Sequence, residues 1–209
     1  MDLQFYGRRL PSETVSDQYP LNIARRLAQK IVGEIAPFCL RAEVAGSIRR
    51  EKPMVKDIEI VAIPRWEERP DPEDLFGERN LRHNLLYEDL RRREHVQWIK
   101  PGTQVIEPWP LKPDGKYWRG LLANNMKLDM FLAEPDNYGA IKLIRTGSME
   151  FNVALFAHAG RVGVDIDRGW FWKEGKKVAT PYEQDVFDLL DLPYVEPRDR
   201  IDGRAVRRV

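Results

Sequence analysis

The sequence contains very few of the residues that build disulfide scaffolds or thiolate metal clusters. Among its 209 residues are one cysteine, Cys39, and three histidines at positions 83, 95 and 158. A single cysteine excludes a disulfide within the chain and also a cluster of thiolate ligands. The histidines share no spacing that is typical of metal ligands. We therefore expect Cys39 to fill an apolar space in a reducing compartment, and we expect no histidine to bind a catalytic metal.

The chain also lacks long apolar runs and an excess of charge of either sign. No apolar run approaches the roughly 20 residues that cross a bilayer, and residues 1–20 contain no apolar signal core. Lys and Arg number 34 against 33 Asp and Glu, which leaves a formal net charge of +1. An acidic or basic tail protein is excluded, so any nucleic-acid binding must come from how the charges are arranged. We expect a cytoplasmic protein.

Apolar residues are nevertheless abundant enough to fill a sizeable core. Hydrophobic residues make up 43% of the chain and aromatic residues 10%, and the length suffices for one large or two small domains. The pattern changes after Pro135, from a helix-covered sheet to a smaller mixed unit. We therefore predict the α+β class, with an N-terminal arm over residues 1–19, a first unit over residues 20–135 and a second over residues 136–209.

Hydrophobic periodicity predicts the main elements of the first unit. Apolar residues at every fourth position from Ile23 to Ile35 predict a helix over residues 21–35. Residues 57–64 are rich in β-branched side chains and predict a strand. The pattern further predicts a loop or frayed helix over residues 65–78, an amphipathic helix over residues 80–96, and strands over residues 117–124 and 126–134.

Capping signals predict where helices of the second unit begin. Ser148 precedes the apolar run "MEFNVALFAHAG" and is expected to cap a helix there. Thr180, Pro181 and Glu183 have the spacing of a capping box, which predicts a further helix with Thr180 at its N-cap.

Two carboxylates lie within the predicted strand over residues 57–64, where burial makes an unpaired charge costly. Side chains two apart on a strand point to the same face, so Asp57 and Glu59 project together. Asp129, in "KLDMFL", has a similar setting. If the two strands are neighbours, three carboxylates share one patch, where they repel one another unless some are protonated or cations lie among them.

Oxygen ligands with few nitrogens nearby suit Mg²⁺, for which Mn²⁺ can substitute. Two such ions would activate an attacking oxygen, stabilise a leaving oxygen and orient a triphosphate. The alternative is that Asp57 merely begins its strand and that Glu59 lies on a solvated face.

A Gly-Ser pair stands shortly before these acids, in "GSIRR". It follows a predicted strand and begins a short helical turn, where backbone N–H groups and the Ser47 hydroxyl can hold a phosphate. The guanidinium groups of Arg49 and Arg50 match the oxygens of a phosphate. A phosphate site that precedes a pair of metal-binding acids favours nucleotidyl transfer.

At these residues the sequence resembles the nucleotidyltransferase superfamily and, more closely, the DNA polymerase beta type of family X. The resemblance extends over about residues 20–203 and implies a palm with a mixed sheet flanked by helices, followed by a small C-terminal α/β subdomain that closes on the nucleotide. It rests on motifs in the family's order, which are "GSIRR" with "DIE", "KLDMFL", "RTGSMEFN" and "PYEQDVFDLLDLPYVEPRDR".

The resemblance also implies roles for individual residues. Asp57, Glu59 and Asp129 would be the catalytic residues and would bind two Mg²⁺ ions, with Asp129 beside the primer 3′-hydroxyl. Lys127 would contact a primer phosphate. The residues that would bind the nucleotide are Gly46, Ser47, Arg49, Arg50, Thr146, Gly147 and Asn152.

Several positions depart from the family pattern. Glu59 stands where aspartate is usual, and its extra methylene shifts the metal. Ile144 and Arg145 stand where the family often has two aromatic residues that help to exclude ribose. Polar or basic contacts to nucleotide and template are replaced by Met149, Val153 and Phe156. Sugar preference, template dependence and fidelity are therefore left open.

We expect a DNA polymerase that fills short gaps during DNA repair. It would bind gapped or primer–template DNA and a deoxynucleoside triphosphate, act as a monomer and bind no membrane. Because about twenty residues precede the first helix, we expect no N-terminal lyase domain. Two other functions stay open: template-independent transfer to RNA, protein or a small molecule, and nucleic-acid or nucleotide binding without catalysis.

Overall fold

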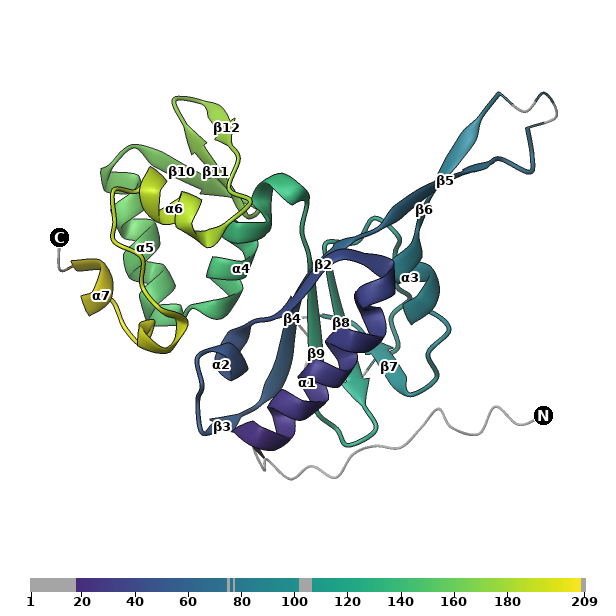
Figure 1. The fold of residues 1–209 in the computed structure, drawn as a ribbon, viewed down its shortest axis with the longest axis horizontal. Coiled ribbons are helices and arrows are strands. Elements are labelled where there is room, and N and C mark those ends of the chain that lie inside the picture. The colour runs from purple at the N-terminus through teal and green to yellow at the C-terminus, as the bar shows by residue number, and fades with distance from the viewer. Residues whose placement is uncertain (1–17, 75, 77, 102–106, 208–209) are drawn as a thin grey trace.

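The computed structural model describes residues 18–74, 76, 78–101 and 107–207. Figure 1 shows two bodies side by side, one built on a sheet with its helices and the other a smaller mixed unit. The predicted α+β class, with a mixed sheet flanked by helices, is confirmed. Within the described part of the chain, no helix is long and apolar enough to cross a membrane.

The larger body contains a five-stranded mixed sheet. Its strands are, in spatial order, β2 (Cys39–Val44), β4 (Asp57–Pro64), β9 (Lys127–Leu132), β8 (Tyr117–Leu122) and β7 (Val96–Ile99). Strands β4 and β9 run parallel in the middle, and every other neighbouring pair is antiparallel. The strands predicted over residues 57–64, 117–124 and 126–134 are therefore confirmed.

Alternating side chains give this sheet two different faces. Even-numbered residues of β4 and β9, such as Ile60 and Met130, are buried in the main core beneath α1 (Leu21–Ile35) and α3 (Leu85–Leu90). Odd-numbered residues, such as Val61 and Phe131, pack against Tyr138 of the smaller body. The acids at positions 57, 59 and 129 are also odd-numbered, so the sheet points them toward the smaller body.

The first helix, α1, has the predicted bounds, but the apolar residues at every fourth position are not all buried. Ile31 and Ile35 are buried, whereas Ile23 is 50% exposed. A strict four-residue spacing drifts around a helix that has 3.6 residues per turn. Ala24 and Ala28 take the inner positions instead and are fully buried in the core between α1 and the sheet.

An antiparallel ribbon replaces the elements predicted over residues 65–78 and the start of the helix predicted over residues 80–96. Its strands are β5 (Trp66–Pro70) and β6 (Asn80–Asn84), and Figure 1 shows it projecting away from the sheet. The helix begins only at Leu85 because the Asn84 side chain accepts a hydrogen bond from the Tyr87 backbone N–H and caps it there.

Most of the predicted N-terminal arm, residues 1–17, lies outside the described residues. Its end is not irregular as predicted, because β1 (Tyr19–Pro20) pairs with β3 (Met54–Val55). Two short helical elements complete the larger body, namely η1 (Ala36–Phe38) and α2 (Gly46–Arg49).

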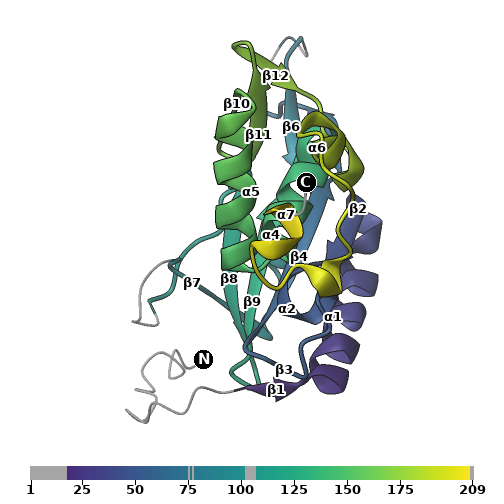
Figure 2. The same ribbon diagram turned by 90° about the vertical axis from the view of Figure 1, so that its left-hand side faces the viewer.

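The smaller body has its own core, in which Phe151, Phe171 and Phe187 are fully buried. Ser148 caps α5 as predicted, because its hydroxyl accepts a hydrogen bond from the Phe151 N–H at 3.0 Å. Figure 2 looks from this side, with the helices of the smaller body in front of the sheet. The elements are η2 (Pro135–Asn137), α4 (Tyr138–Thr146), α5 (Met149–Arg161), β10 (Val164–Asp167), β11 (Trp170–Lys173), β12 (Lys176–Val178), α6 (Glu183–Leu189), η3 (Pro197–Asp199) and α7 (Arg204–Arg207). A domain boundary between residues 135 and 136 stays a prediction.

Candidate active site

Three acids lie on the sheet face that points toward the smaller body. The register of β4 and β9 pairs Glu59 with Asp129 and Asp57 with Lys127. On the other side of β9, the register with β8 pairs Asp129 with Arg119. The predicted adjacency of the two acidic strands is confirmed, and one row across three strands carries Glu59, Asp129 and Arg119.

The two acids of β4 lie where their negative charge is disfavoured. Burial, followed by the charge of Asp129, raises the pKa of Asp57. Burial, followed by the charges of Asp57 and Asp129, raises the pKa of Glu59 to about 8. Nearby cations, Arg50 among them, offset these effects only in part. Negative charge that stays unbalanced in this way favours the binding of a cation.

The Glu59 carboxylate lies over the Gly-Ser turn. Gly46 has a φ of +64°, and a Cβ at this position would lie 1.8 Å from Glu59 Oε2. Glycine therefore suits both the left-handed backbone and the close carboxylate. In the next residue, Ser47, the hydroxyl oxygen is buried and has no hydrogen-bond partner among the described residues. A buried hydroxyl of this kind is available to a ligand.

Asp129 differs from the other two acids because it is already paired. Arg119 donates from Nε to Oδ1 and from Nη2 to Oδ2, both at 2.7 Å. Tyr117 donates its hydroxyl to Oδ1, also at 2.7 Å. Asp129 is 4% exposed, and its bidentate bond is the main cause that raises the pKa of Arg119.

The three carboxylates could serve as ligands of a divalent cation, because they supply hard oxygen ligands and lie on one face of the sheet. Their side chains do not converge on one point. In the described part of the chain, no three His, Cys, Asp or Glu side chains form a group that could hold a metal ion. Glu59 lies over Gly46, and Asp129 is held by Arg119. Binding of a cation by all three acids would require Asp129 to exchange its guanidinium partner for the ion.

The two arginines of the Gly-Ser segment have different surroundings. Arg49 donates to Thr146 Oγ1 at 2.7 Å and to the two carboxylate oxygens of Glu183 at 2.5 and 2.7 Å. Arg50 donates from Nη1 to the carbonyl oxygens of Thr146 and Gly147. Its Nε is buried and has no partner among the described residues. Of the two, Arg50 therefore has the donor that a phosphate could use.

Glu183 connects the two bodies. It accepts hydrogen bonds from Arg49 of the larger body and from Arg200, whose Nη1 and Nη2 lie 2.8 and 3.2 Å from its oxygens. Tyr194 adds its hydroxyl at 3.0 Å. Burial by itself raises the pKa of Glu183, but hydrogen bonds and charges from Arg49 and Arg200 lower it to about 2.

The prediction that Thr180 is the N-cap of a capping box at α6 is wrong, because the box that the structure shows has Tyr182 at the N-cap and Asp185 at N3. Helix α6 begins at Glu183 rather than at Pro181, and Asp185 caps it by accepting the Tyr182 N–H at 2.7 Å. Thr180 instead forms backbone hydrogen bonds with Asp136 and Gly139. These bonds keep the segment before the helix extended against the start of α4.

A cavity of about 400 Å³ lies between the two bodies beside Glu59. Arg50 and Gly147 line it, and so does Asn152, whose amide donates to the Ile144 carbonyl at 2.7 Å while its Oδ1 has no partner among the described residues. Arg49 and Thr146 do not line this cavity, and the Arg49 guanidinium instead donates to Thr146 Oγ1 and to Glu183.

The outer part of the cavity is apolar and open. Met149 is 74% exposed and Val153 is 63% exposed, and with Phe156 they form one stripe on α5. Lys127 lies apart, exposed at the start of β9 and opposite Asp57.

Sequence reasoning assigned no role to Arg119, Tyr117 or Arg200, although Arg200 ends the motif "PYEQDVFDLLDLPYVEPRDR". A signal for the first two was present, because the alternation over residues 117–122 places both odd-numbered side chains on one face. A hairpin between the strands over residues 117–124 and 126–134 would have set them opposite the acid in "KLDMFL". Arg200 is 0% exposed, and the sequence gives no sign that an arginine so close to charged neighbours is buried.

Replacing Glu59 with glutamine is expected to stabilise the protein at high pH when no divalent cation is present. The folded-state pKa of Glu59, about 8, lies above its ordinary value of 4.5. Its contribution to stability is therefore complete below about pH 4.5 and is lost as the pH rises through about 8. Glutamine stays neutral, so we expect Glu59→Gln to raise the free energy of unfolding by about 2–4 kcal/mol near pH 9 and to leave it nearly unchanged near pH 4.

Urea denaturation at a series of pH values in the presence of a chelator measures this difference. Glu94→Gln is the matched control, because Glu94 is exposed and distant in sequence from the acids. A Glu59→Gln profile parallel to that of the control would show that Glu59 ionises normally.

Comparison with known proteins adds two findings. Residues 142–201 match the family model described as DNA polymerase beta thumb. A segment of 128 residues, 61% of this chain, is 28% identical to the protein named DNA polymerase IV of Saccharomyces cerevisiae (strain ATCC 204508 / S288c). The match covers 20% of that yeast protein, so the chain spans only about a fifth of the length of this relative.

Proposed function

We propose, from the premise that this chain is a protein of the DNA polymerase beta type, that it is a DNA polymerase. It would transfer a nucleotidyl group from a deoxynucleoside triphosphate to the 3′-hydroxyl of a primer and fill short gaps during DNA repair. The observation that supports this most is the acidic face of β4 and β9 beside a cavity that Arg50 lines. We further propose that the protein acts as a cytoplasmic monomer.

The primer 3′-hydroxyl would give up its proton with the help of Asp129, its oxygen would attack the α-phosphorus in line, and the bond from that phosphorus to the leaving pyrophosphate oxygen would break. When bound, two Mg²⁺ ions would stabilise the attacking and leaving oxygens and neutralise the triphosphate. Asp57, Glu59 and Asp129 are the residues that would hold them. Because burial and mutual repulsion raise the pKa of Glu59 to about 8, this group must lose its proton before it can serve as a ligand.

The chain's other groups would position the substrate. The free Nε of Arg50 and the unpaired Ser47 hydroxyl are donors for the β- and γ-phosphates. Gly147 and Asn152 line the part of the cavity next to Arg50 and would contact the sugar and base. Lys127 would contact a primer phosphate. Arg49 would act indirectly, because its bonds to Thr146 and Glu183 hold the segment that carries Arg50 against the smaller body.

Primer extension tests this function. The folded protein is incubated with Mg²⁺ or Mn²⁺, labelled deoxynucleoside triphosphates and a gapped duplex, and we expect addition directed by the template base. A folded sample that binds the gapped DNA but adds no nucleotide with either ion would instead identify a binding module that has kept the fold.

Template-independent transfer is a second candidate, and the apolar stripe of Met149, Val153 and Phe156 favours it. These side chains offer no hydrogen-bond donor, and only the weakly accepting Met149 sulfur, with which to discriminate one base pair from another. Omission of the template strand from the same assay distinguishes the candidates. Equal addition to a single strand, or equal use of ribonucleotides, would support this second function over gap filling.

A further inference from the structure

We propose that Arg119 competes with the divalent cation for Asp129, so that the ion completes its ligand set only when it displaces the guanidinium. The inference rests on the proposed function, because it concerns the metal that nucleotidyl transfer would use. Arg119 is therefore a positioning residue: it would set how much metal the protein needs before Asp129 becomes available.

The Arg119–Asp129 pair uses the oxygens that a cation would need. Both carboxylate oxygens accept from the guanidinium at 2.7 Å, and Oδ1 also accepts from Tyr117 at 2.7 Å. A carboxylate has about four lone-pair positions, and three are thereby occupied. A divalent cation brought next to this guanidinium would be repelled by its positive charge as well as excluded by its atoms.

The pairing is selective among the three acids. In the part of the chain that the structure describes, no ion pair joins Asp57 or Glu59 to a basic side chain, whereas Asp129 has a bidentate one. Arg119 stands in the same row because β8 pairs it with Asp129. One acid of the three is thus paired by the protein itself, and the other two have no ion-pair partner that an incoming ion would have to displace.

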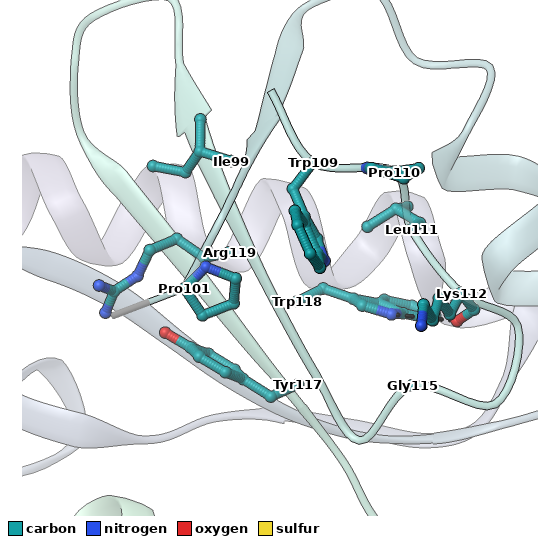
Figure 3. A pocket seen from close by; sticks show the side chains of 10 residues that line it. All are labelled: Ile99, Pro101, Trp109, Pro110, Leu111, Lys112, Gly115, Tyr117, Trp118 and Arg119. Atoms are coloured by element: carbon teal, nitrogen blue, oxygen red, sulfur yellow. Dashed lines mark hydrogen bonds between the residues drawn. The ribbon is translucent and has the colours of Figure 1, made fainter. Parts of the chain in front are cut away.

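The surroundings allow Arg119 to leave while Tyr117 stays. The Tyr117 ring is stacked on Phe131, with the ring centres 4.9 Å apart and the planes at 5°, whereas the Arg119 side chain is 24% exposed. Figure 3 shows the Tyr117 hydroxyl and the Arg119 guanidinium at the same end of a pocket, with Pro101 nearby. This pocket has a volume of about 70 Å³, and the Arg119 side chain lines it.

Titration with Mn²⁺, followed by electron paramagnetic resonance of the free ion, tests the competition without any assay of catalysis. Arg119→Met keeps much of the apolar stem and removes the competing charge. We expect its dissociation constant for Mn²⁺ to fall by about tenfold to a hundredfold, the worth of a charge-assisted bidentate pair. Arg119→Lys keeps the positive charge but cannot form the bidentate bond. Its dissociation constant for Mn²⁺ is expected to lie between those of Arg119→Met and the wild type.

Thermal unfolding gives a second measurement on the same proteins. Without metal, Arg119→Met is expected to melt below the wild type because Asp129 is left buried without its partner. With saturating Mn²⁺, the difference in melting temperature between the two proteins should disappear or change sign. The matched control is Arg93→Met, because Arg93 also forms an ion pair, with Asp89 on α3 and Glu34 on α1, and its loss should leave Mn²⁺ affinity unchanged.

The outcomes separate this inference from the proposed function. Suppose that the wild type binds Mn²⁺, that Arg119→Met binds it equally or more weakly, and that Mn²⁺ raises the melting temperature of both proteins equally. Arg119 then does not compete with the ion, so the inference is wrong while the proposed function stands. If neither protein binds Mn²⁺, with or without a deoxynucleoside triphosphate, both are wrong. Should Arg119→Met fail to fold, the Arg119→Lys titration decides in the same way.

Discussion

Asp57→Asn is expected to lower the rate of nucleotide incorporation by about 10³-fold or more while leaving the protein folded and at least as stable. The substitution removes one carboxylate charge at nearly constant shape. Loss of a ligand that anchors the proposed ions would remove several kcal/mol of transition-state stabilisation. Stability should not fall, because burial and the charge of Asp129 raise the pKa of Asp57, so its charge destabilises the metal-free fold.

Asp129→Asn provides a revealing contrast. We expect a similar loss of activity, but here accompanied by a lower melting temperature, because Arg119 loses its bidentate partner. Single-turnover incorporation and thermal unfolding measure the two effects. Asp136→Asn is the control, since Asp136 is exposed and lies outside the acidic face. Normal incorporation by Asp57→Asn would remove the acids of β4 from the mechanism.

Glu183→Gln is expected to cost about 3–5 kcal/mol of the free energy of unfolding, the usual effect of removing one partner from a buried ion pair. The side chains of Glu183 and Arg200 are 6% and 0% exposed, and that of Arg49 is 18% exposed. Without the carboxylate, two guanidinium groups would face each other with no anion between them. Because Arg49 precedes Arg50 directly, nucleotide binding should also weaken.

The pH dependence of this effect has a definite sign. The pKa of Glu183 in the folded protein, about 2, lies below its ordinary value of 4.5. Its contribution to stability is therefore present above about pH 4.5 and is lost as the pH falls toward about 2. Urea denaturation measures the free energy of unfolding of the wild type and of Glu183→Gln, and the difference between them should become smaller as the pH falls through this range. The exposed control Glu94→Gln should show no such difference from the wild type. A small difference in the free energy of unfolding that does not vary with pH would mean that the ionised Glu183 contributes little to stability.

The acidic face was predictable from sequence because strand geometry is strict. Side chains alternate with a period of two, so the positions of Asp57 and Glu59 fix their common face once the strand is recognised. The same rule separates Asp129 from its apolar neighbours. The adjacency of the two strands depends on long-range contacts, and in the sequence only the ordered motifs of the family predict it.

Other features depend on contacts that local patterns do not contain. The ribbon of β5 and β6 is stabilised by cross-strand pairing. Its exposed Leu81 lies at a spacing that also suits the apolar face of a helix, which is why the sequence pattern predicts a helix from residue 80. Glu183 stands at a spacing that suits a capping box, yet its carboxylate is used by two arginines distant in sequence. The Arg119–Asp129 pair likewise depends on the register of β8 against β9.

The proposed function requires the acids of β4 and β9 to hold divalent ions beside a triphosphate. Counting bound Mn²⁺ by electron paramagnetic resonance, with a deoxynucleoside triphosphate and a primer that lacks its 3′-hydroxyl, tests it most directly. We predict about two ions per chain for the wild type and a marked loss for Asp57→Asn. An unchanged count in Asp57→Asn, or no ion bound by the wild type under these conditions, would contradict it.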